Sequence, residues 1–250
     1  MRRLNSTPKS GGKQSLDREE GFTSTQAKLT LRHMKAVGFF FISNVFVRTV
    51  FGQETLFQDD FKGRLGPGWS WVREHREAWR ITKHGLEVRI EPGNMWGPEN
   101  NARNLLVRSA PNIANAALEI SVNVENKPSH QYEQADLVWY YDDSNMVKLG
   151  EELVDGKLSV VMGREEKDKT RTIAIIPLDS TTLHLKITVK GRRVRGEFKS
   201  SSANDWRVVG ECDAPTMIDG RAKISLQFYQ GRPNLEHWAR VTEFKVVKVQ

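Results

Sequence analysis

The sequence predicts an all-β protein, with a two-sheet jelly-roll sandwich over residues 56–250. Two observations carry this prediction. About a dozen short stretches alternate apolar and polar residues, and turns rich in Gly, Pro, Asn and Asp separate them. No stretch keeps a 3.6-residue periodicity over three turns. Many short strands without helices favour a sandwich or barrel, and this chain is long for an immunoglobulin-type sandwich. A jelly roll of two curved sheets, with one concave face, fits the length better.

The expected strands follow one another along the chain between turn residues. They are residues 85–93, 102–111, 116–128, 133–145, 146–153, 156–165, 171–178, 182–191, 193–201, 206–211, 222–231 and 242–249. The segment 68–79, GWSWVREHREAW, precedes them and is expected to form an entry loop and first strands.

Alternation within residues 132–140 assigns side chains to opposite faces of a sheet. Ala135, Leu137 and Trp139 point one way, together with Glu133 at the strand's solvated end, and this more apolar set is expected to face the core. The other set carries two tyrosines, an amide and a carboxyl group, and is the candidate concave face. It comprises Tyr132, Gln134, Asp136, Val138 and Tyr140.

The charge distribution argues against a nucleic-acid partner. The formal net charge is +7, but residues 1–52 hold nine Lys/Arg and three Asp/Glu, a net of +6. The rest of the chain is therefore near neutral, whereas phosphate-binding faces need clustered excess Lys and Arg. The one cysteine, Cys212, excludes an intramolecular disulfide, and the six scattered histidines match no zinc spacing.

The N-terminal residues are expected to direct export. Residues 1–33 are polar and predict a disordered extension, or a start site annotated too early, before Met34. Residues 34–52 predict a signal peptide for secretion or for the periplasm and cell envelope: Lys35 precedes an apolar run, and Val50 and Gly52 suit a cleavage site. The run is shorter than the roughly 20 residues of a stable membrane span. An uncleaved anchor or a buried apolar segment is the alternative.

Several ordered motifs over residues 56–150 resemble the concanavalin A-like domain found at the C-terminus of some β-xylosidases and in stand-alone proteins. The motifs are a DDF element, a Gly-Trp-x-Trp-x-Arg-Glu stretch, Trp-Gly, Asn-x-x-Asn-Leu-Leu, Tyr-Glu-Gln-Ala and Asn-x-x-Lys-Leu. The matching residues are Asp59–Phe61, Gly68, Trp69, Trp71, Arg73, Glu74, Trp96, Gly97, Asn101, Asn104–Leu106, Tyr132–Ala135, Asn145, Lys148 and Leu149. Asp136 departs from the pattern, because the family usually has Gly there.

The resemblance implies a lectin/glucanase-type sandwich associated with carbohydrate. A sugar ring has an apolar face, which aromatic side chains contact, and hydroxyl groups that Asn, Gln, Arg, Asp and Glu can bind. We therefore expect an oligo- or polysaccharide partner without chemistry at the site. The candidate contacts are Trp71, Arg73, Glu74, Trp96, Asn101, Arg103, Asn104, Tyr132, Gln134, Asp136, Tyr140 and Lys148.

Two other functions stay open at this point. Glu74 and Asp136 are the one carboxylate pair for a glycoside hydrolase, since the Glu-x-Asp-x-x-Glu pattern of sandwich glucanases is absent from the sequence. The aromatic residues could instead all be core, in a structural or protein-interaction sandwich. No cofactor is expected, although Asp59 and Asp60 could ligate calcium. The oligomeric state does not follow from the sequence.

Overall fold

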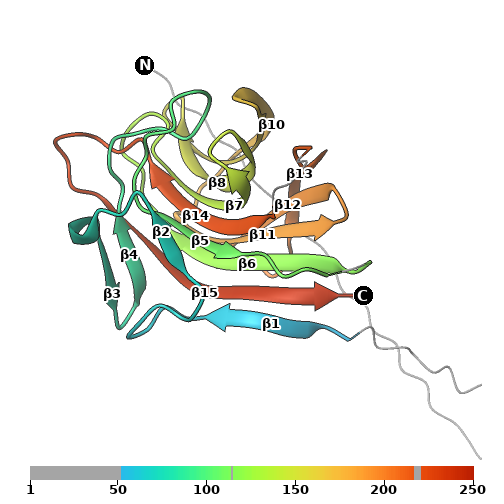
Figure 1. Ribbon diagram of the computed structural model, residues 1–250. Coiled ribbons are helices and arrows are strands. Elements are labelled where there is room, and N and C mark those ends of the chain that lie inside the picture. Colours follow the sequence, from blue (N-terminus) through green and yellow to red (C-terminus); the bar gives the residue numbers. More distant parts are fainter. Residues whose placement is uncertain (1–51, 114, 217–220) are drawn as a thin grey trace, which may run out of the picture. The chain divides into compact units, whose positions relative to one another are not determined.

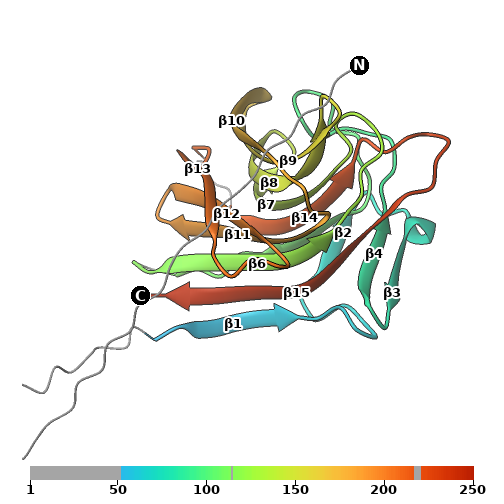
Figure 2. The same ribbon diagram turned by 180° about the vertical axis from the view of Figure 1, so that it is seen from behind.

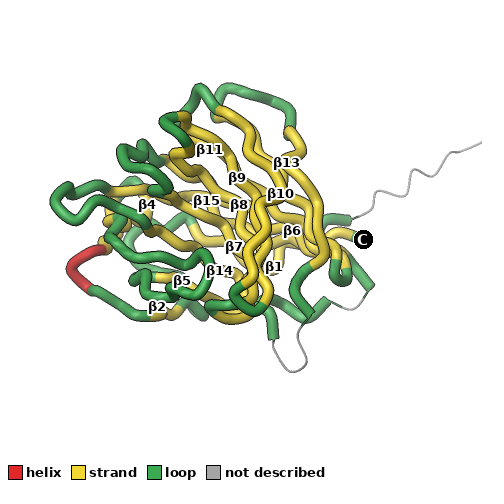
Figure 3. The backbone as a smooth tube through the Cα atoms, turned by 90° about the horizontal axis from the view of Figure 1, so that it is seen from above, coloured by secondary structure: helices red, strands yellow, loops and turns green. Residues whose placement is uncertain are grey.

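The computed structural model describes residues 52–113, 115–216 and 221–250, which belong to one compact unit. This unit consists almost entirely of antiparallel strands, and the one helical segment among the described residues is a single 3-10 turn, η1 (Arg76–Ala78) (Figure 3). All twelve expected strands form, and three short ones precede them. The two-sheet all-β prediction is confirmed.

Eight strands make the first sheet, in the order β13-β12-β11-β6-β15-β4-β3, with β1 paired to β15. Figure 1 shows β1, β15 and β6 side by side in this layer. The bounds are β1 (Glu54–Asp59), β3 (Trp79–Thr82), β4 (Gly85–Arg89), β6 (Ala117–Glu125), β11 (Thr182–Lys190), β12 (Arg193–Ser200), β13 (Arg207–Asp213) and β15 (Trp238–Val249).

Seven strands make the second sheet, in the order β10-β9-β8-β7-β14-β5-β2. This sheet forms the other layer, as the view from behind also shows (Figure 2). The bounds are β2 (Ser70–Val72), β5 (Leu105–Ser109), β7 (Gln134–Asp142), β8 (Asn145–Val154), β9 (Lys157–Glu166), β10 (Lys169–Pro177) and β14 (Lys223–Tyr229).

The main core lies between the two sheets. Leu137 of β7 and Leu149 of β8 are directly opposite each other in the ladder, and both join this core with no exposed surface. Aliphatic residues of β6 and β11, such as Val122 and Leu185, complete it from the first sheet. Burial of this apolar surface is the dominant stabilising term of such a fold.

A second, smaller apolar cluster lies on the other side of the seven-stranded sheet. It includes Val138, Tyr140 and Met146 together with Met95 from the loop before β5. Ala135, Leu137 and Trp139 belong to the main core instead, so the face assignment made from alternation is confirmed. On β5, Leu106 belongs to the main core and Leu105 to the second cluster.

Candidate functional site

A groove on the outer face of the seven-stranded sheet, the face that does not pack on the other sheet, brings four of the predicted contact residues together. Its volume is about 570 Å³. The loop before β5, the turn before β7, and strands β8 to β10 supply its walls and floor. The lining residues are Asn94, Trp96, Tyr132, Gln134, Lys148, Glu152, Val154, Asp155, Val161, Thr172, Ile175 and Gln230.

The indole of Trp96 is fixed against the sheet by its own loop. Asn94 brackets the residue: its side-chain oxygen accepts from Trp96 N at 3.0 Å, and its amide donates to Trp96 O at 3.0 Å. The next amide, Gly97 N, donates to Glu165 Oε2 at 3.1 Å. Gly163 of β9 leaves room for the ring, because a Cβ at that position would come within 2.5 Å of it. The groove therefore has a positioned aromatic platform.

A lysine ammonium forms part of the floor. Lys148 Nζ donates to Gln134 Oε1 and, at 3.0 Å, to Glu152 Oε2. It lies 4.8 Å from the centroid of the Trp96 ring, within range of a cation–π contact. The lysine side chain is only 3% exposed, so its charge is held in one place by these three partners.

Tyr132 borders the groove in an unusual backbone conformation. Its φ is 66°, a region that non-glycine residues adopt infrequently. The following residue, Glu133, fixes the turn: its buried carboxylate accepts from the amides of Ser129 and His130 and contacts His237. Burial raises the pKa of Glu133, but the hydrogen bonds from His237 and Ser129 lower it more, so the net pKa lies below its usual value. Glu133 was expected at a solvated strand end, and it is instead 1% exposed.

Tyr132 and Ile175 present apolar surface at the groove. Each is 48% exposed, and they are two of only four large hydrophobic side chains this exposed among the described residues. Exposed aromatic and aliphatic side chains beside fixed polar groups are typical of ligand sites.

Further titratable groups lie buried behind the floor. Asp136 of β7 is 2% exposed, and burial raises its pKa to about 7, although the charge of Lys148 acts in the opposite direction. Burial also raises the pKa of Glu165 of β9 to about 7, against the hydrogen bond from Gly97. Both side-chain polar atoms of Gln227, on β14 beside Asp136, lack a hydrogen-bond partner.

The other predicted contact residues lie outside the groove lining, and several brace loops. Arg73 pairs with Asp143 at 2.6 Å and donates to Ala102 O at 2.6 Å. Asn104 is buried, and its side chain bridges the backbone N and O of His75. Asn101 accepts from Asn94 N, Tyr140 donates to Asp143, and Arg103 is exposed on the loop.

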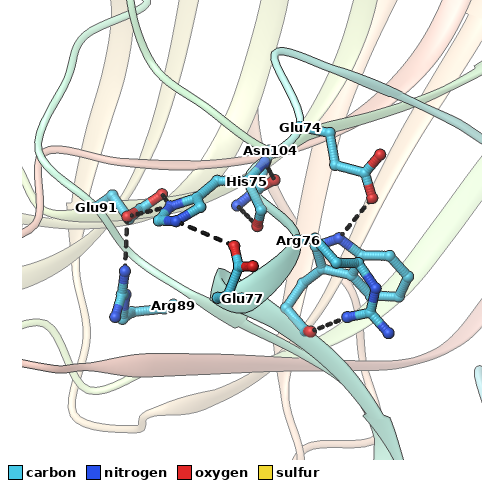
Figure 4. A network of polar contacts seen from close by, with 8 residues as sticks. Glu74, His75, Arg76, Glu77, Arg89, Glu91 and Asn104 are labelled. Atoms are coloured by element: carbon cyan, nitrogen blue, oxygen red, sulfur yellow. Dashed lines mark hydrogen bonds and ion pairs between the residues drawn. The ribbon is translucent and has the colours of Figure 1, made fainter.

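The tryptophans of the segment 68–79 pack rather than line the groove. Trp71 lies 4.9 Å from Trp79, centroid to centroid, and both contact the main core. Glu74 accepts from Trp79 Nε1 at 3.0 Å, while Arg76 donates to Trp79 O, as Figure 4 shows. In the same view His75 bonds Glu91, which Arg89 also contacts.

The two carboxylates considered for hydrolysis lie in different surroundings. Glu74 is exposed and bonded to a tryptophan of the first sheet, whereas Asp136 is buried on the second sheet. Neither residue lines the groove. The structure therefore gives no observation that favours hydrolysis by these two groups.

The carboxylate of Asp59 is occupied by protein donors. It accepts from Phe61 N, Gly66 N and Trp69 Nε1 at 2.7 to 3.0 Å. Asp60 is exposed and accepts from Lys62 N. In the described part of the chain, no group of three or more His, Cys, Asp or Glu side chains is arranged to hold a metal ion. Calcium binding stays an untested expectation.

The expected extension (1–33) and all but the last residue of the expected signal peptide (34–52) lie outside the described residues. Within the described ranges, no helix is long and apolar enough to cross a membrane.

A model of a known protein family matches residues 58–232; its description is "Beta xylosidase C-terminal Concanavalin A-like domain". A comparison with curated proteins gives no match. Among solved structures, the chain is similar to the GH43 protein BlXynB from Bacillus licheniformis, with 18% identity and a TM-score of 0.66 over 76% of this chain. It is also similar to a xylan β-1,4-xylosidase from Bacillus halodurans C-125, with 17% identity and a TM-score of 0.65 over 76% of this chain.

These two matches cover 39% and 38% of the longer bacterial chains. A third similar structure is a functionally unknown protein from Saccharomyces cerevisiae, with 15% identity and a TM-score of 0.55, over 72% of this chain and 95% of that one. At these identities the structural likeness shows the fold. The family match spans most of the chain, and it agrees with the motifs that the sequence carries. The chain therefore belongs to the family of β-xylosidase C-terminal concanavalin A-like domains.

Proposed function

We propose that this protein binds an oligo- or polysaccharide in the groove on the outer face of the seven-stranded sheet, without chemistry of its own. The observation that carries the proposal is the fixed pair of Trp96 and Lys148. An aromatic ring and a charged donor lie 4.8 Å apart in one groove, as an apolar sugar face and its hydroxyl rim require.

The rest of the groove supports the same partner. Gln134 and Glu152 supply oxygens that accept from hydroxyl groups, and Asn94 supplies an amide. Tyr132 and Ile175 add exposed apolar surface at the groove. The groove's volume of about 570 Å³ lies within the range of small-molecule sites, roughly 300–1,000 Å³.

A cavity of similar size, about 620 Å³, lies next to Trp139 between residues 109–113 and 221–222. Its lining holds three polar or charged side chains, Ser109, Asn112 and Arg221, fewer than the groove beside Trp96 offers. This contrast favours the groove beside Trp96 as the glycan site. Export through residues 34–52 would place the protein where extracellular polysaccharides occur, and it remains part of the proposal.

Titration calorimetry of the full chain against a panel of polysaccharides and their oligomers, xylan-type glycans included, tests the proposal. We expect saturable binding that Trp96→Ala weakens at least tenfold, about 1.4 kcal/mol. Trp206→Ala is the matched control, since Trp206 lies outside the groove, within 4.4 Å of Lys186 Nζ on the other sheet.

Equal loss in both variants, or full binding by Trp96→Ala, would place the glycan elsewhere. Absence of binding to every glycan would favour a protein-interaction sandwich. Thermal unfolding of each variant shows whether the fold is retained.

A further inference from the structure

We infer that the groove selects neutral glycans against their uronic-acid counterparts. This inference rests on the proposed function and names the class of sugar that the site takes. It follows from the charges that line the groove and from the way in which its one cation is already engaged.

Among the described residues that line the groove, carboxylates outnumber cations. Lys148 is the one cation, and Glu152 and Asp155 are the two carboxylates. A uronate would bring a further negative charge into a partly enclosed space, where like charges repel more strongly than in bulk water. Two more carboxyl groups, Asp136 and Glu165, lie buried behind the floor and add no positive charge.

Lys148 has little capacity left for an anion. An ammonium group has three donors, and two of them already go to Gln134 Oε1 and Glu152 Oε2. The remaining donor can serve one hydroxyl group. A carboxylate is bound best by two parallel donors, as an arginine provides, and no described residue of the groove lining is an arginine.

Two arginines of the neighbouring loop and strand, Arg73 and Arg164, are committed to other partners, and the exposed Arg103 and Arg171 do not belong to the groove lining. Arg73 pairs with Asp143 at 2.6 Å, and Arg164 pairs with Glu166 at 2.8 Å and donates to Asp213 O. Neutral hydroxyl groups match the groove better, because Glu152, Gln134 and Asp155 offer acceptors that a hydroxyl can donate to and a carboxylate cannot.

The test compares each neutral glycan that binds with the same glycan oxidised at C6, so that a primary alcohol becomes a carboxylate. Cello-oligosaccharides and their C6-oxidised forms are the first pair. Xylose has no C6, so for xylo-oligosaccharides the pair is an oligomer with a glucosyl branch and the same oligomer with a glucuronosyl branch. We expect the acidic member to bind the full chain at least tenfold more weakly at low salt. The gap in affinity between the neutral and the acidic member should narrow as added salt screens the charges.

The substitution Asp155→Asn tests whether the negative charges of the groove cause the weaker binding of acidic glycans. Asp155 is exposed and contacts Gln131 rather than Lys148, so its replacement removes a charge without disturbing the floor. We expect the gap between the neutral and the acidic glycan to narrow severalfold in this variant. Asp205→Asn, an exposed carboxylate outside the groove lining, is the control and should leave the gap unchanged.

The outcomes separate the two proposals. Equal or tighter binding of the acidic member would overturn the inference and leave glycan binding intact. An unchanged gap in Asp155→Asn would also overturn it, since the selection would not arise from the groove's charges. Failure of every neutral and acidic glycan to bind would overturn the proposed function, and the inference with it.

Discussion

Both faces of the seven-stranded sheet bury side chains, but most of the buried charged and polar ones lie on the outer face, beside its small apolar cluster. The inner face carries Leu137, Leu149 and Val160, none of which is exposed. The outer face, on the same strands, carries Asp136 and Lys148, which are 2% and 3% exposed. Burial in this protein therefore does not mean an apolar environment.

This difference in composition indicates which face contributes more to stability and which is available for another role. Burying aliphatic side chains favours folding, whereas burying charged groups opposes it unless their partners compensate. The outer face therefore adds less to stability than the inner face does. We attribute its composition to the groove, whose floor it forms.

One residue of the inner face is an exception to its apolar composition. Glu151 of β8 lies opposite Ala135 and Val160, which belong to the main core. It has no exposed surface, and neither of its side-chain oxygens has a hydrogen-bond partner. Burial alone raises its pKa to about 9. Glu151 is therefore protonated in the folded protein at neutral pH.

The largest expected effect is the pH dependence of stability that Glu151 imposes. The folded pKa of about 9 lies above the reference value of 4.5. The contribution of Glu151 to stability is therefore complete below pH 4.5, and it declines as the pH rises toward 9. The decline is about 1.4 kcal/mol for each pH unit between the two values. Glu151→Gln should remove this slope in denaturant titrations between pH 5 and 9.

Glu99→Gln serves as the control for that experiment, because Glu99 is exposed on the loop before β5. Its stability should follow the pH profile of the parent protein. If the stability of the parent protein depended on pH as little as that of Glu151→Gln, Glu151 would have to be hydrogen-bonded or solvated in solution. Glu151 would then no longer be an unpaired polar group on the inner face.

A smaller pH effect is expected from the outer face, at Asp136. Its pKa of about 7 again exceeds the reference value of 3.8, so its contribution is complete below pH 3.8 and is lost as the pH rises to about 7. Lys148 limits the shift, and Glu151 has no such cation. In denaturant titrations, Asp136→Asn should therefore remove a slope that ends near pH 7, while the slope due to Glu151 continues above it.

Lys148→Met sharpens this comparison. Without the ammonium, the pKa of Asp136 should rise further, and the pH at which its slope ends should move upward. If Asp136→Asn and the parent protein lose stability equally between pH 4 and 7, Asp136 is ionised at no cost, and the outer face is better solvated than the structure indicates.

The alternation of residues was sufficient to predict the two faces. In residues 132–140 it separated Leu137 and Trp139 from Gln134 and Asp136, because each position on a strand points to the side opposite its neighbours. The same rule, continued from Val147 and Leu149, would have placed Glu151 on the inner face. The inward position of Glu151 could therefore have been predicted from the sequence. Two consecutive glutamates, Glu151 and Glu152, made the alternation of apolar and polar residues hard to recognise there.

The groove itself could not be derived in the same way. Trp96 lies over β9 because its loop folds back and Gly163 leaves room for its ring, a relation between residues far apart in the chain. Trp71 and Trp79 pack against each other with their rings tilted by 34°, and both contact the main core. The segment that carries them has the composition of a binding loop. Only the tertiary arrangement shows whether such tryptophans bind a ligand or pack in the core.

The smallest expected effect is a difference between two adjacent valines of β9. Val160 lies in the main core with no exposed surface, and Val161 lines the groove with 5% exposed. Val160→Ala should cost about 2 kcal/mol, because its cavity is enclosed by apolar side chains. Val161→Ala should cost about 1 kcal/mol or less, since water can enter from the groove.

The pair is a matched test of the comparison, because the residue type, the strand and the substitution are the same and only the face differs. Denaturant titration measures the loss in free energy of unfolding caused by each substitution. Glycan titration measures its effect on glycan affinity. Val161→Ala should alter glycan affinity severalfold, whereas Val160→Ala should leave it unchanged at temperatures where the protein is folded. Equal costs would mean that the outer face contributes as much to stability as the inner one, and its polar composition would then need an explanation other than the groove.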